Sequence, residues 1–440
     1  GWAQADGTAE VFGQAFAATS ISGVILSLLT RRVNSELQIR DGFFVTAAFW
    51  IVLGLYGSLP FLLSDALEVS IVDAIFESVS GLTTTGATVL AGLDSLPQSI
   101  LLYRQLLQWL GGIGIIVLAV AVLPMLGIGG MQLYRAESPG PVKDNKLTPR
   151  ITETAKALWY LYLGFTILCA GAYWAAGMSL FDAICHSFST VAIGGFSTHD
   201  ASIGHFQSPA IETVAIVFMV LAGINFALHF LAWNRREPKL YWADREVRLY
   251  LTILAVVAVV VCFILIEHPG ASDSPIRDGI FQAVSVATTT GFTTSDFSLW
   301  PSAAPGLLLF AAFAGGCAGS TAGGIKVVRV LLIYLQGMRE IRRLIHPNGV
   351  FTIKLGLQRV PDRVVDAVWG FFSVYVIVFL TMVSLIMVIA PLDFTTAFSA
   401  VAACLNNLGP GLGDVALNYA SLPAQAKWLL IVAMMLGRLE

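Results

Sequence analysis

Thr83-Thr84-Thr85-Gly86 is a short threonine-rich segment that ends in glycine, and comparable segments recur at intervals along the whole chain. The other three are Val191-Ala192-Ile193-Gly194, Thr288-Thr289-Thr290-Gly291 and Asn406-Asn407-Leu408-Gly409. Each follows an apolar segment that is too short to cross a bilayer and precedes one that is long enough. Internal repetition of this kind predicts four copies of one structural unit.

The composition indicates a membrane protein. The chain has 440 residues, of which 56% are apolar and 12% are charged, whereas soluble domains carry about 25% charged residues. A membrane-spanning helix needs about 20 mainly apolar residues. Long uncharged stretches cover residues 11–30, 43–63, 105–134, 157–181, 213–233, 249–266, 297–325 and 367–390, and a further one begins at residue 422. We therefore predict nine crossings and four short re-entrant segments.

The basic residues predict the orientation of these segments. Most of the 25 lysines and arginines lie in four connections, at residues 31–40, 135–156, 235–248 and 326–363. Basic connections face the cytoplasm, and these four alternate with the glycine-ended signatures, so the signatures enter the membrane from outside. The basic residues outside these connections are Arg104, Arg277, Lys427 and Arg438.

The organisation that follows is an all-α membrane protein of four parallel helix–pore loop–helix repeats around a shared axis. Residues 1–36 form an additional membrane helix, and the repeats cover residues 37–150, 151–245, 246–360 and 361–440. The first residues lack the pattern of a secretory leader. We expect a preceding helix and a following tail to lie outside this sequence.

The short apolar segments carry helix-start residues. Asp73, Asp182 and Asp278 precede their signatures by similar spacings and are candidate N-caps. In the fourth copy Asp393, Thr395 or Thr396 is the candidate. A helix that begins there would end at the signature and point its partially negative end at the centre. Asp73 and Asp182 could also attract cations to the outer mouth.

The signatures have the composition of a carbonyl-lined ion filter. Irregular backbone is tolerated deep in a membrane only where it lines water or protein. Glycine supplies the unusual dihedral angles that align successive carbonyls, and a carbonyl ring replaces the hydration shell of an alkali cation. All sixteen signature residues are candidate ion ligands; the alternative is four glycine-terminated helices. Because Val191 and Asn406 replace a threonine, we expect modest discrimination between potassium and sodium.

A glycine-rich stretch lies where the second helix of the third repeat is expected. Its glycines are Gly315, Gly316, Gly319, Gly323 and Gly324, followed by Lys326. Each interior glycine costs a helix about 1 kcal/mol relative to alanine, so a continuous helix is disfavoured. The stretch is a candidate gate, and close packing of small residues is the alternative. A phosphate-binding loop is excluded because Ile325 precedes the lysine.

The signatures resemble those of the Trk/Ktr/HKT superfamily of potassium transporters, and most of all the Trk-type bacterial potassium-uptake membrane subunits. The resemblance rests on Thr84-Thr85-Gly86, Thr289-Thr290-Gly291, Trp109-Leu110-Gly111-Gly112-Ile113-Gly114, Asn406-Asn407-Leu408-Gly409-Pro410-Gly411 and Gly437-Arg438. It implies a single-chain pseudo-tetrameric pore, paired as a homodimer in the bacterial inner membrane. A cytosolic ring of nucleotide-binding regulatory subunits would open this pore.

The resemblance also implies roles for individual residues. Arg438 would face the pore and, with Lys326 beside the glycine-rich gate, raise the barrier to a cation. A snorkelling side chain at a helix end is the alternative for Arg438. Potassium would be the transported ion held at the signatures, with membrane lipid as surroundings and no organic cofactor.

Other functions find less support. A symporter that couples potassium to sodium or protons needs intramembrane carboxylates, and Glu77, Glu153 and Glu212 show no evident partner in the sequence. No catalytic constellation is present, so an enzyme is not expected, nor is a nucleic-acid partner. The histidines show no ligand spacing, and the cysteines lie in apolar segments.

Overall fold

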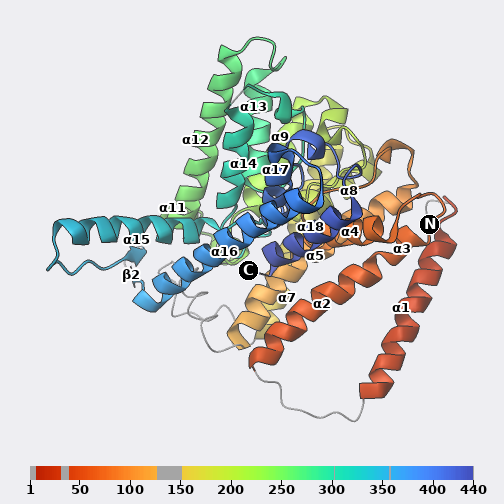
Figure 1. Ribbon diagram of the computed structural model, residues 1–440, viewed down its shortest axis with the longest axis horizontal. Helices are drawn as coiled ribbons and strands as arrows, with labels where there is room; N and C mark the ends of the chain where they lie inside the picture. The colour runs from red at the N-terminus through yellow and green to blue at the C-terminus, as the bar shows by residue number, and fades with distance from the viewer. Residues whose placement is uncertain (1–5, 31–38, 126–150, 302, 356–357, 440) are drawn as a thin grey trace.

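The computed structural model describes residues 6–30, 39–125, 151–301, 303–355 and 358–439. It is a bundle of α-helices in which a first helix, α1 (Ala9–Thr30), precedes four helix–pore loop–helix units (Figure 1). The all-α fold class expected from the sequence is confirmed.

The four units share a basic order of a long helix, a short helix, a 3₁₀ turn and a further helix, to which repeat 1 adds α3 and repeats 2 and 3 add helices at the end. Repeat 1 comprises α2 (Ile39–Gly57), α3 (Leu59–Leu62), α4 (Ile71–Leu82), η1 (Leu93–Ser95) and α5 (Gln98–Met125). Repeat 2 comprises α7 (Ile151–Ala175), α8 (Leu180–Val191), η2 (Ser202–Phe206), α9 (Pro209–Ala222), α10 (Phe226–Arg235) and α11 (Lys239–Ala243). Repeat 3 comprises α12 (Arg245–Glu267), α13 (Pro275–Ala287), η3 (Phe297–Leu299), α14 (Ala304–Ala314) and α15 (Val327–Ile345). Repeat 4 comprises α16 (Asp362–Ile389), α17 (Phe394–Leu405), η4 (Gly413–Val415) and α18 (Ala424–Arg438).

The short helices α4, α8, α13 and α17, which we call the pore helices, begin as expected in repeat 4 and differently from the expectation in the other three repeats. Their N-caps are Ser70, Ser179, Ser274 and Asp393. Asp73 and Asp182 lie in the first turn, where each backbone N–H donates to the capping serine, so a serine three residues earlier is the cap. Only in repeat 4 is an aspartate the N-cap, because Asp393 accepts from the Thr396 N–H at 3.1 Å.

Apolar side chains cover much of the outside of the bundle. Within the described residues, five helices are long and apolar enough to cross a membrane: α1, Phe44–Leu62, Ala155–Ala175, α12 and α16. The bent pair α9 and α10 makes a sixth candidate. The nine predicted crossings stay a prediction. Large exposed side chains such as Leu29, Phe44, Val259 and Val388 are placed as lipid-facing residues would be, since a bilayer removes the need for a polar surface.

The second helices of repeats 2 and 3 are both interrupted. In repeat 2 the axis turns by 92° between α9 and α10, a break that the uncharged run of residues 213–233 did not predict. In repeat 3 the helix stops at Ala314 and resumes at Val327, across the glycine-rich stretch.

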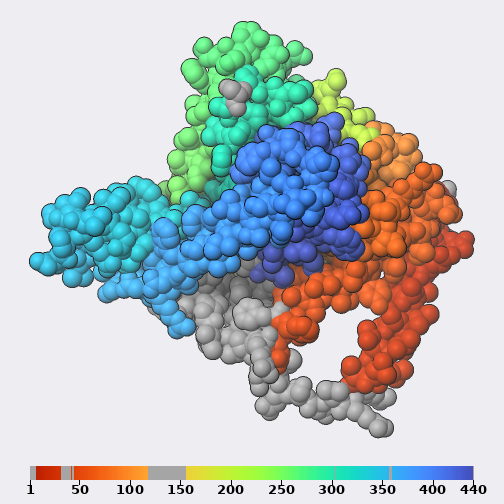
Figure 2. All heavy atoms as spheres, in the orientation of Figure 1, coloured from red at the N-terminus to blue at the C-terminus, as the bar shows by residue number. Residues whose placement is uncertain are grey.

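Two parts of the chain extend from the bundle. Helix α15 projects sideways at one end of the molecule (Figure 1), and a two-stranded antiparallel pair, β1 (Lys354–Leu355) and β2 (Gln358–Arg359), follows it. Figure 2 shows α1 as a red arm at the opposite edge. Arg339 on α15 contacts Asp362 at the start of α16 at 2.5 Å, which ties the projecting helix to repeat 4.

Candidate ion-conduction site

Each pore helix ends with the same pair of backbone hydrogen bonds. In repeat 1 the Thr84 N–H donates to the Gly81 carbonyl and the Thr85 N–H to the Ser80 carbonyl, both at 2.9 Å. The equivalent pairs are Ile193 to Thr190 with Gly194 to Ser189, Thr289 to Val286 with Thr290 to Ser285, and Asn407 to Cys404 with Leu408 to Ala403. Four segments of unlike sequence therefore adopt one backbone conformation.

The left-handed backbone positions give the register of these segments. Thr84, Ile193, Thr289 and Asn407 have φ values between 51° and 65°, which is unusual for residues other than glycine. Two residues later stand Gly86, Gly195, Gly291 and Gly409, with φ between 77° and 99°. In each repeat the residue of the first of these two rows is the second, and the glycine is the fourth, of a four-residue segment. We call these four segments together the filter, and we number its levels from one to four along each segment.

This register corrects the sequence alignment in repeat 2. Its filter quartet is Ala192-Ile193-Gly194-Gly195, shifted by one residue, and Val191 is the last residue of α8. The double glycine made either register compatible with the pattern. The spacing from the pore-helix aspartates carried the signal that was missed, because the interval from Asp73 to Gly86 equals the interval from Asp182 to Gly195.

The four segments close into a ring. A Cβ atom added to Gly86 would lie 2.0 Å from the carbonyl oxygen of Gly194 in repeat 2. A Cβ atom added to Gly195 would lie 2.0 Å from Thr290 O. One added to Gly291 would lie 2.1 Å from Leu408 O, and one added to Gly409 would lie 2.8 Å from Thr85 O. Each glycine therefore packs against the third-level carbonyl of the next repeat, and the fourth contact returns to the first repeat. No side chain fits at these four positions.

The filter levels are chemically unequal. From the first level to the third they hold Thr83, Ala192, Thr288 and Asn406; Thr84, Ile193, Thr289 and Asn407; and Thr85, Gly194, Thr290 and Leu408. Repeats 1 and 3 match closely, because Thr83 Oγ1 lies 2.7 Å from Thr85 Oγ1 and Thr288 Oγ1 lies 2.8 Å from Thr290 Oγ1. The inequality expected from the sequence holds in the corrected register, with Ala192 in place of Val191.

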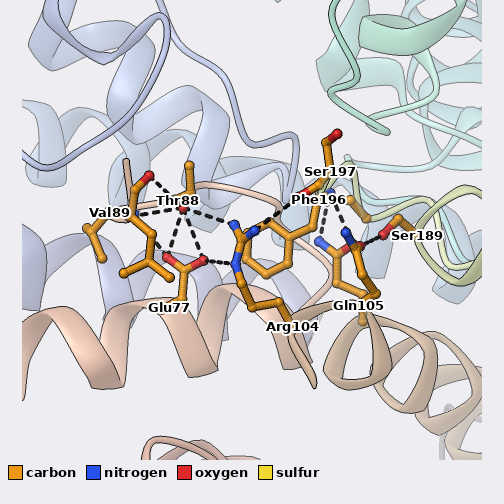
Figure 3. Close-up of polar contacts among 11 residues, drawn as sticks. Glu77, Thr88, Val89, Arg104, Gln105, Ser189, Phe196 and Ser197 are labelled. Carbon is orange, nitrogen blue, oxygen red and sulfur yellow. Dashed lines mark hydrogen bonds and ion pairs between the residues drawn. The ribbon is translucent and has the colours of Figure 1, made fainter. Parts of the chain in front are cut away.

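A buried ion pair holds the filter segments of repeats 1 and 2 together (Figure 3). Arg104 on α5 donates from Nε to Glu77 Oε1 at 2.7 Å, and both side chains are buried. Arg104 also donates to the Ser197 carbonyl at 3.1 Å and stacks over the Phe196 ring. Glu77 accepts from the Val89 N–H at 3.0 Å. The pair thus clamps the chain that leaves two neighbouring filter segments.

The carboxylates singled out for the symporter hypothesis do have partners. Glu77 pairs with Arg104, and Glu212 on α9 pairs with Arg277 of the pore helix α13. Neither pair was evident in the sequence, because each partner comes from a different element and local spacing does not reveal it. The side chain of Glu153 lies outside the described residues.

A glutamine on α5 supports the filter of repeat 2. Gln108 Nε2 donates to the Gly194 carbonyl at 2.6 Å, and its Oε1 accepts from the Phe196 N–H at 3.1 Å. One third-level carbonyl is therefore shared with a side chain. The next polar residue on this helix, Gln105, contacts Ser189 of α8 through its Oε1 (Figure 3).

Above the filter, a pocket is lined by all four fourth-level glycines together with Thr88, Ser197, His199 and Tyr419. We call the side of the molecule on which this pocket lies the outer face. Asp73 does not act there as a free charge, since Lys427 Nζ lies 2.6 Å from its Oδ1. Asp182 accepts from the Thr198 hydroxyl at 2.7 Å. The idea that these aspartates attract cations is therefore weakened for Asp73.

Below the filter, residues 315–326 form a loop that contacts the filter segments of repeats 3 and 4 and the residue that precedes the filter segment of repeat 2. The Gly324 N–H donates to the Asn406 carbonyl at 3.1 Å, and the Gly323 N–H donates to Thr289 Oγ1 at 2.7 Å. Thr321 Oγ1 donates to the carbonyl of Val191, directly before the filter of repeat 2, at 2.9 Å. The glycine-rich stretch is therefore placed at the inner end of the filter.

The same loop interlocks with the break in repeat 2. The Cys317 N–H donates to the Gly223 carbonyl at 2.9 Å, and the Phe226 N–H donates to the Gly319 carbonyl at 3.1 Å. Glu246 at the start of α12 accepts from the Ala318 N–H at 2.7 Å. Sequence reasoning missed this second break, for which Gly223 and Asn225 inside an apolar run were the available signal.

Arg438 bridges this loop and repeat 1. Its Nη1 donates to the Thr321 carbonyl and its Nη2 to the Gly111 carbonyl on α5, both at 3.2 Å. The residue is buried, so it does not snorkel to a surface. Lys326 precedes α15 with φ of 76°, and its Nζ contacts the Ala322 carbonyl within the loop.

The sequence as a whole matches one family model, described as TrkH, cation transport protein, over residues 8–440. This chain belongs to the TrkH family. The Trk system potassium uptake protein TrkH of Vibrio parahaemolyticus is 57% identical over 440 residues, which is 99% of this chain and 90% of that protein. TrkH of Escherichia coli K12 is 54% identical over 438 residues, again with 99% and 90% covered.

The fold agrees with that of a solved TrkH. The crystal structure of the potassium transporter TrkH from Vibrio parahaemolyticus matches with a TM-score of 0.90 at 53% identity, covering 99% of this chain and 90% of that one. The superfamily resemblance drawn from the signatures is thereby confirmed. The family is one of cation transport proteins, which agrees with the expectation that this chain is not an enzyme.

Proposed function

We propose that this chain takes up potassium across the bacterial plasma membrane through a gated, channel-like pore. The observation that carries the proposal is the closed ring in which each fourth-level glycine packs on the third-level carbonyl of the next repeat. Such a ring brings main-chain oxygens from four repeats to one axis, as an alkali-cation filter requires. Relatives at 54–57% identity are named as potassium uptake proteins.

In this proposal potassium enters the outer pocket, exchanges its water for filter carbonyls, and moves inward past the loop of residues 315–326. The membrane potential supplies about 2.3 kcal/mol per charge for each 100 mV. The filter levels are unequal, and Gly194 shares its carbonyl with Gln108. Fewer matched ligands at each level support a modest preference for potassium over sodium.

The loop of residues 315–326 is the proposed gate. Its backbone and Thr321 are hydrogen-bonded to the inner end of the filter, so displacing the loop would free that end. Arg438 and Lys326 donate to carbonyls of this loop, and the proposal gives their positive charges the role of opposing a passing cation.

Helix α15 offers a route for regulation from the cytosol. It follows the loop without a linker, projects from the bundle, and ends in a basic turn with Arg342 and Arg343 (Figure 1). A nucleotide-binding regulatory ring that moves α15 would therefore move the loop. We propose such a ring as the partner, and a homodimer in the inner membrane as the assembly; ordinary cytoplasmic anchoring is the alternative role of these arginines.

Single-channel recording in a planar bilayer tests this proposal against a symporter. The expected result is discrete current steps in potassium that become smaller when sodium replaces it. Gly291→Ser places a side chain against Leu408 O and should lower the potassium-to-sodium permeability ratio. Gly306→Ser, where an added Cβ meets no atom within 4 Å, is the matched control. An unchanged ratio in Gly291→Ser, or flux that requires a second ion gradient, would overturn the proposal.

A further inference from the structure

Three side chains with metal-ligating atoms meet on the outer face, away from the filter carbonyls. Asp94 belongs to η1 of repeat 1, and His199 and His205 belong to the loop and η2 that follow the filter of repeat 2. One ligand atom from each lies within 4.8 Å of the others. Asp94 and His199 are far apart in the sequence, so local spacing could not reveal the cluster.

The cluster is partly organised. Asp94 Oδ1 lies 2.5 Å from His199 Nδ1, and the rings of His199 and His205 stack with centroids 3.5 Å apart. Phe206 packs edge-on against both imidazole rings at 5.4 and 5.2 Å. Asp94 also accepts a weak hydrogen bond from the Asp200 N–H at 3.4 Å. The loops of repeats 1 and 2 therefore hold the donors at one place.

The donor set selects a class of ion. Two imidazoles and one carboxylate suit zinc and similar divalent transition metals, whereas alkali and alkaline-earth ions prefer oxygen ligands alone. Zinc sites with three protein ligands keep a fourth position for water. Because zinc binds its donors at about 2 Å, His205 must turn out of its parallel stack. Its side chain is exposed and free of the packed interior, so this is a rotation at the surface.

An ion bound at this cluster would lie close enough to the pore entrance to affect an arriving potassium ion. His199 lines the same outer pocket as Gly86 and Gly195, so a divalent charge held there lies beside the entrance to the filter. Its repulsion of an arriving potassium ion is strongest at low ionic strength, since salt screens charges over about 10 Å at 0.1 M.

We propose that Asp94, His199 and His205 form a binding site for zinc or a similar divalent transition metal at the outer mouth, and that the bound ion slows potassium entry. The binding half stands on the cluster alone. The slowing of entry rests on the proposed transport function.

The binding half is tested on purified, tag-free protein in detergent. Zinc titrated by calorimetry in the presence of excess magnesium should bind to the wild type with one more site than to His205→Ala or Asp94→Asn. Mutation of an outer-shell partner typically lowers metal affinity about 10–100-fold, so the loss of a ligand itself should lower it at least tenfold. His268→Ala, which alters another exposed histidine, at the end of α12, is the matched control and should bind as the wild type does. Equal zinc binding by wild type and His205→Ala would overturn the site.

The effect on entry is tested in proteoliposomes with zinc added outside. Potassium influx should fall at least twofold in the wild type and in His268→Ala, while His205→Ala keeps its basal influx and resists zinc. Zinc binding without any fall in wild-type influx would overturn the slowing of entry and leave the site. Intact zinc binding in a protein that passes no potassium would instead count against the proposed transport function.

Discussion

Repeats 1 and 3 have the same filter residues and opposite structures beneath them. Both carry Thr-Thr-Thr-Gly, with the same hydroxyl contact at 2.7 and 2.8 Å and the same pair of backbone hydrogen bonds. Yet α5 runs unbroken from Gln98 to Met125, whereas repeat 3 has no helix between Ala314 and Val327. The filter is built by repetition, whereas the loop of residues 315–326 below it belongs to repeat 3 alone.

Glycine serves both arrangements for different physical reasons. Gly111 stays helical and provides space, because an added Cβ would lie 1.9 Å from the Leu82 carbonyl at the base of the filter. Gly315 provides conformation, with φ of 63° and ψ of −151°, a region that residues with a Cβ avoid. A glycine-rich stretch in a membrane helix therefore predicts close packing or a break, and the contacts around it decide which.

Repeats 1 and 3 should differ most in how much stability is lost when a partner of a buried pore-helix side chain is removed, because only repeat 1 has a buried charge there. The residue the same number of positions before the filter glycine is Glu77 in repeat 1 and the neutral Gln282 in repeat 3. Arg104→Met leaves Glu77 buried without its arginine, which should cost about 3–5 kcal/mol. Gln282→Met removes one hydrogen bond to the Ser295 carbonyl and should cost about 1 kcal/mol. Thermal unfolding in detergent, followed by tryptophan fluorescence, measures both, and equal losses would contradict the comparison.

Substitutions at Gly315 and Gly111 should have different effects on potassium transport, because the first glycine provides a conformation and the second provides space. Gly315→Ala strains the loop by about 1–3 kcal/mol, which corresponds to a shift of about 5–150-fold in a two-state equilibrium. We expect potassium flux without any activating partner to rise by a factor in this range, with selectivity unchanged. Gly111→Ala instead pushes α5 against the filter and should lower the permeability ratio. Potassium and sodium flux into proteoliposomes distinguish them, and the same response from both variants would show that the break has no special role.

The sequence was sufficient to predict the fold where the chain repeats itself. It was insufficient to predict the contacts between elements that are distant in the sequence. Four signatures, the pore helices and the break at Gly315 follow from local composition. The register of repeat 2 was ambiguous, because Gly194 and Gly195 are adjacent and only one takes the left-handed conformation. The pairs Glu77–Arg104 and Lys427–Asp73 depend on which helices become neighbours, and no local pattern records that.

Arg438 connects the two structures compared, since it donates to Gly111 O of repeat 1 and to Thr321 O in the loop of repeat 3. If its charge opposes potassium, Arg438→Gln should raise single-channel conductance a few-fold, because a barrier of about 1 kcal/mol is removed. If it acts only as a link, Gln should behave as the wild type and only Arg438→Ala should change gating. Conductance measured at matched voltage decides between these, and no change in either variant would remove Arg438 from the pathway.

Gly337 on α15 should give the smallest effect and serves as the reference for both uses of glycine. An added Cβ meets no atom within 4 Å, and the residue lies inside a helix. Gly337→Ala should therefore stabilise α15 by about 1 kcal/mol through helix propensity alone. Slower amide hydrogen exchange in α15, with potassium flux equal to that of the wild type, is the expected outcome. A change in flux would instead mean that α15 bends at Gly337 during opening, so that the region particular to repeat 3 extends beyond the loop into the projecting helix.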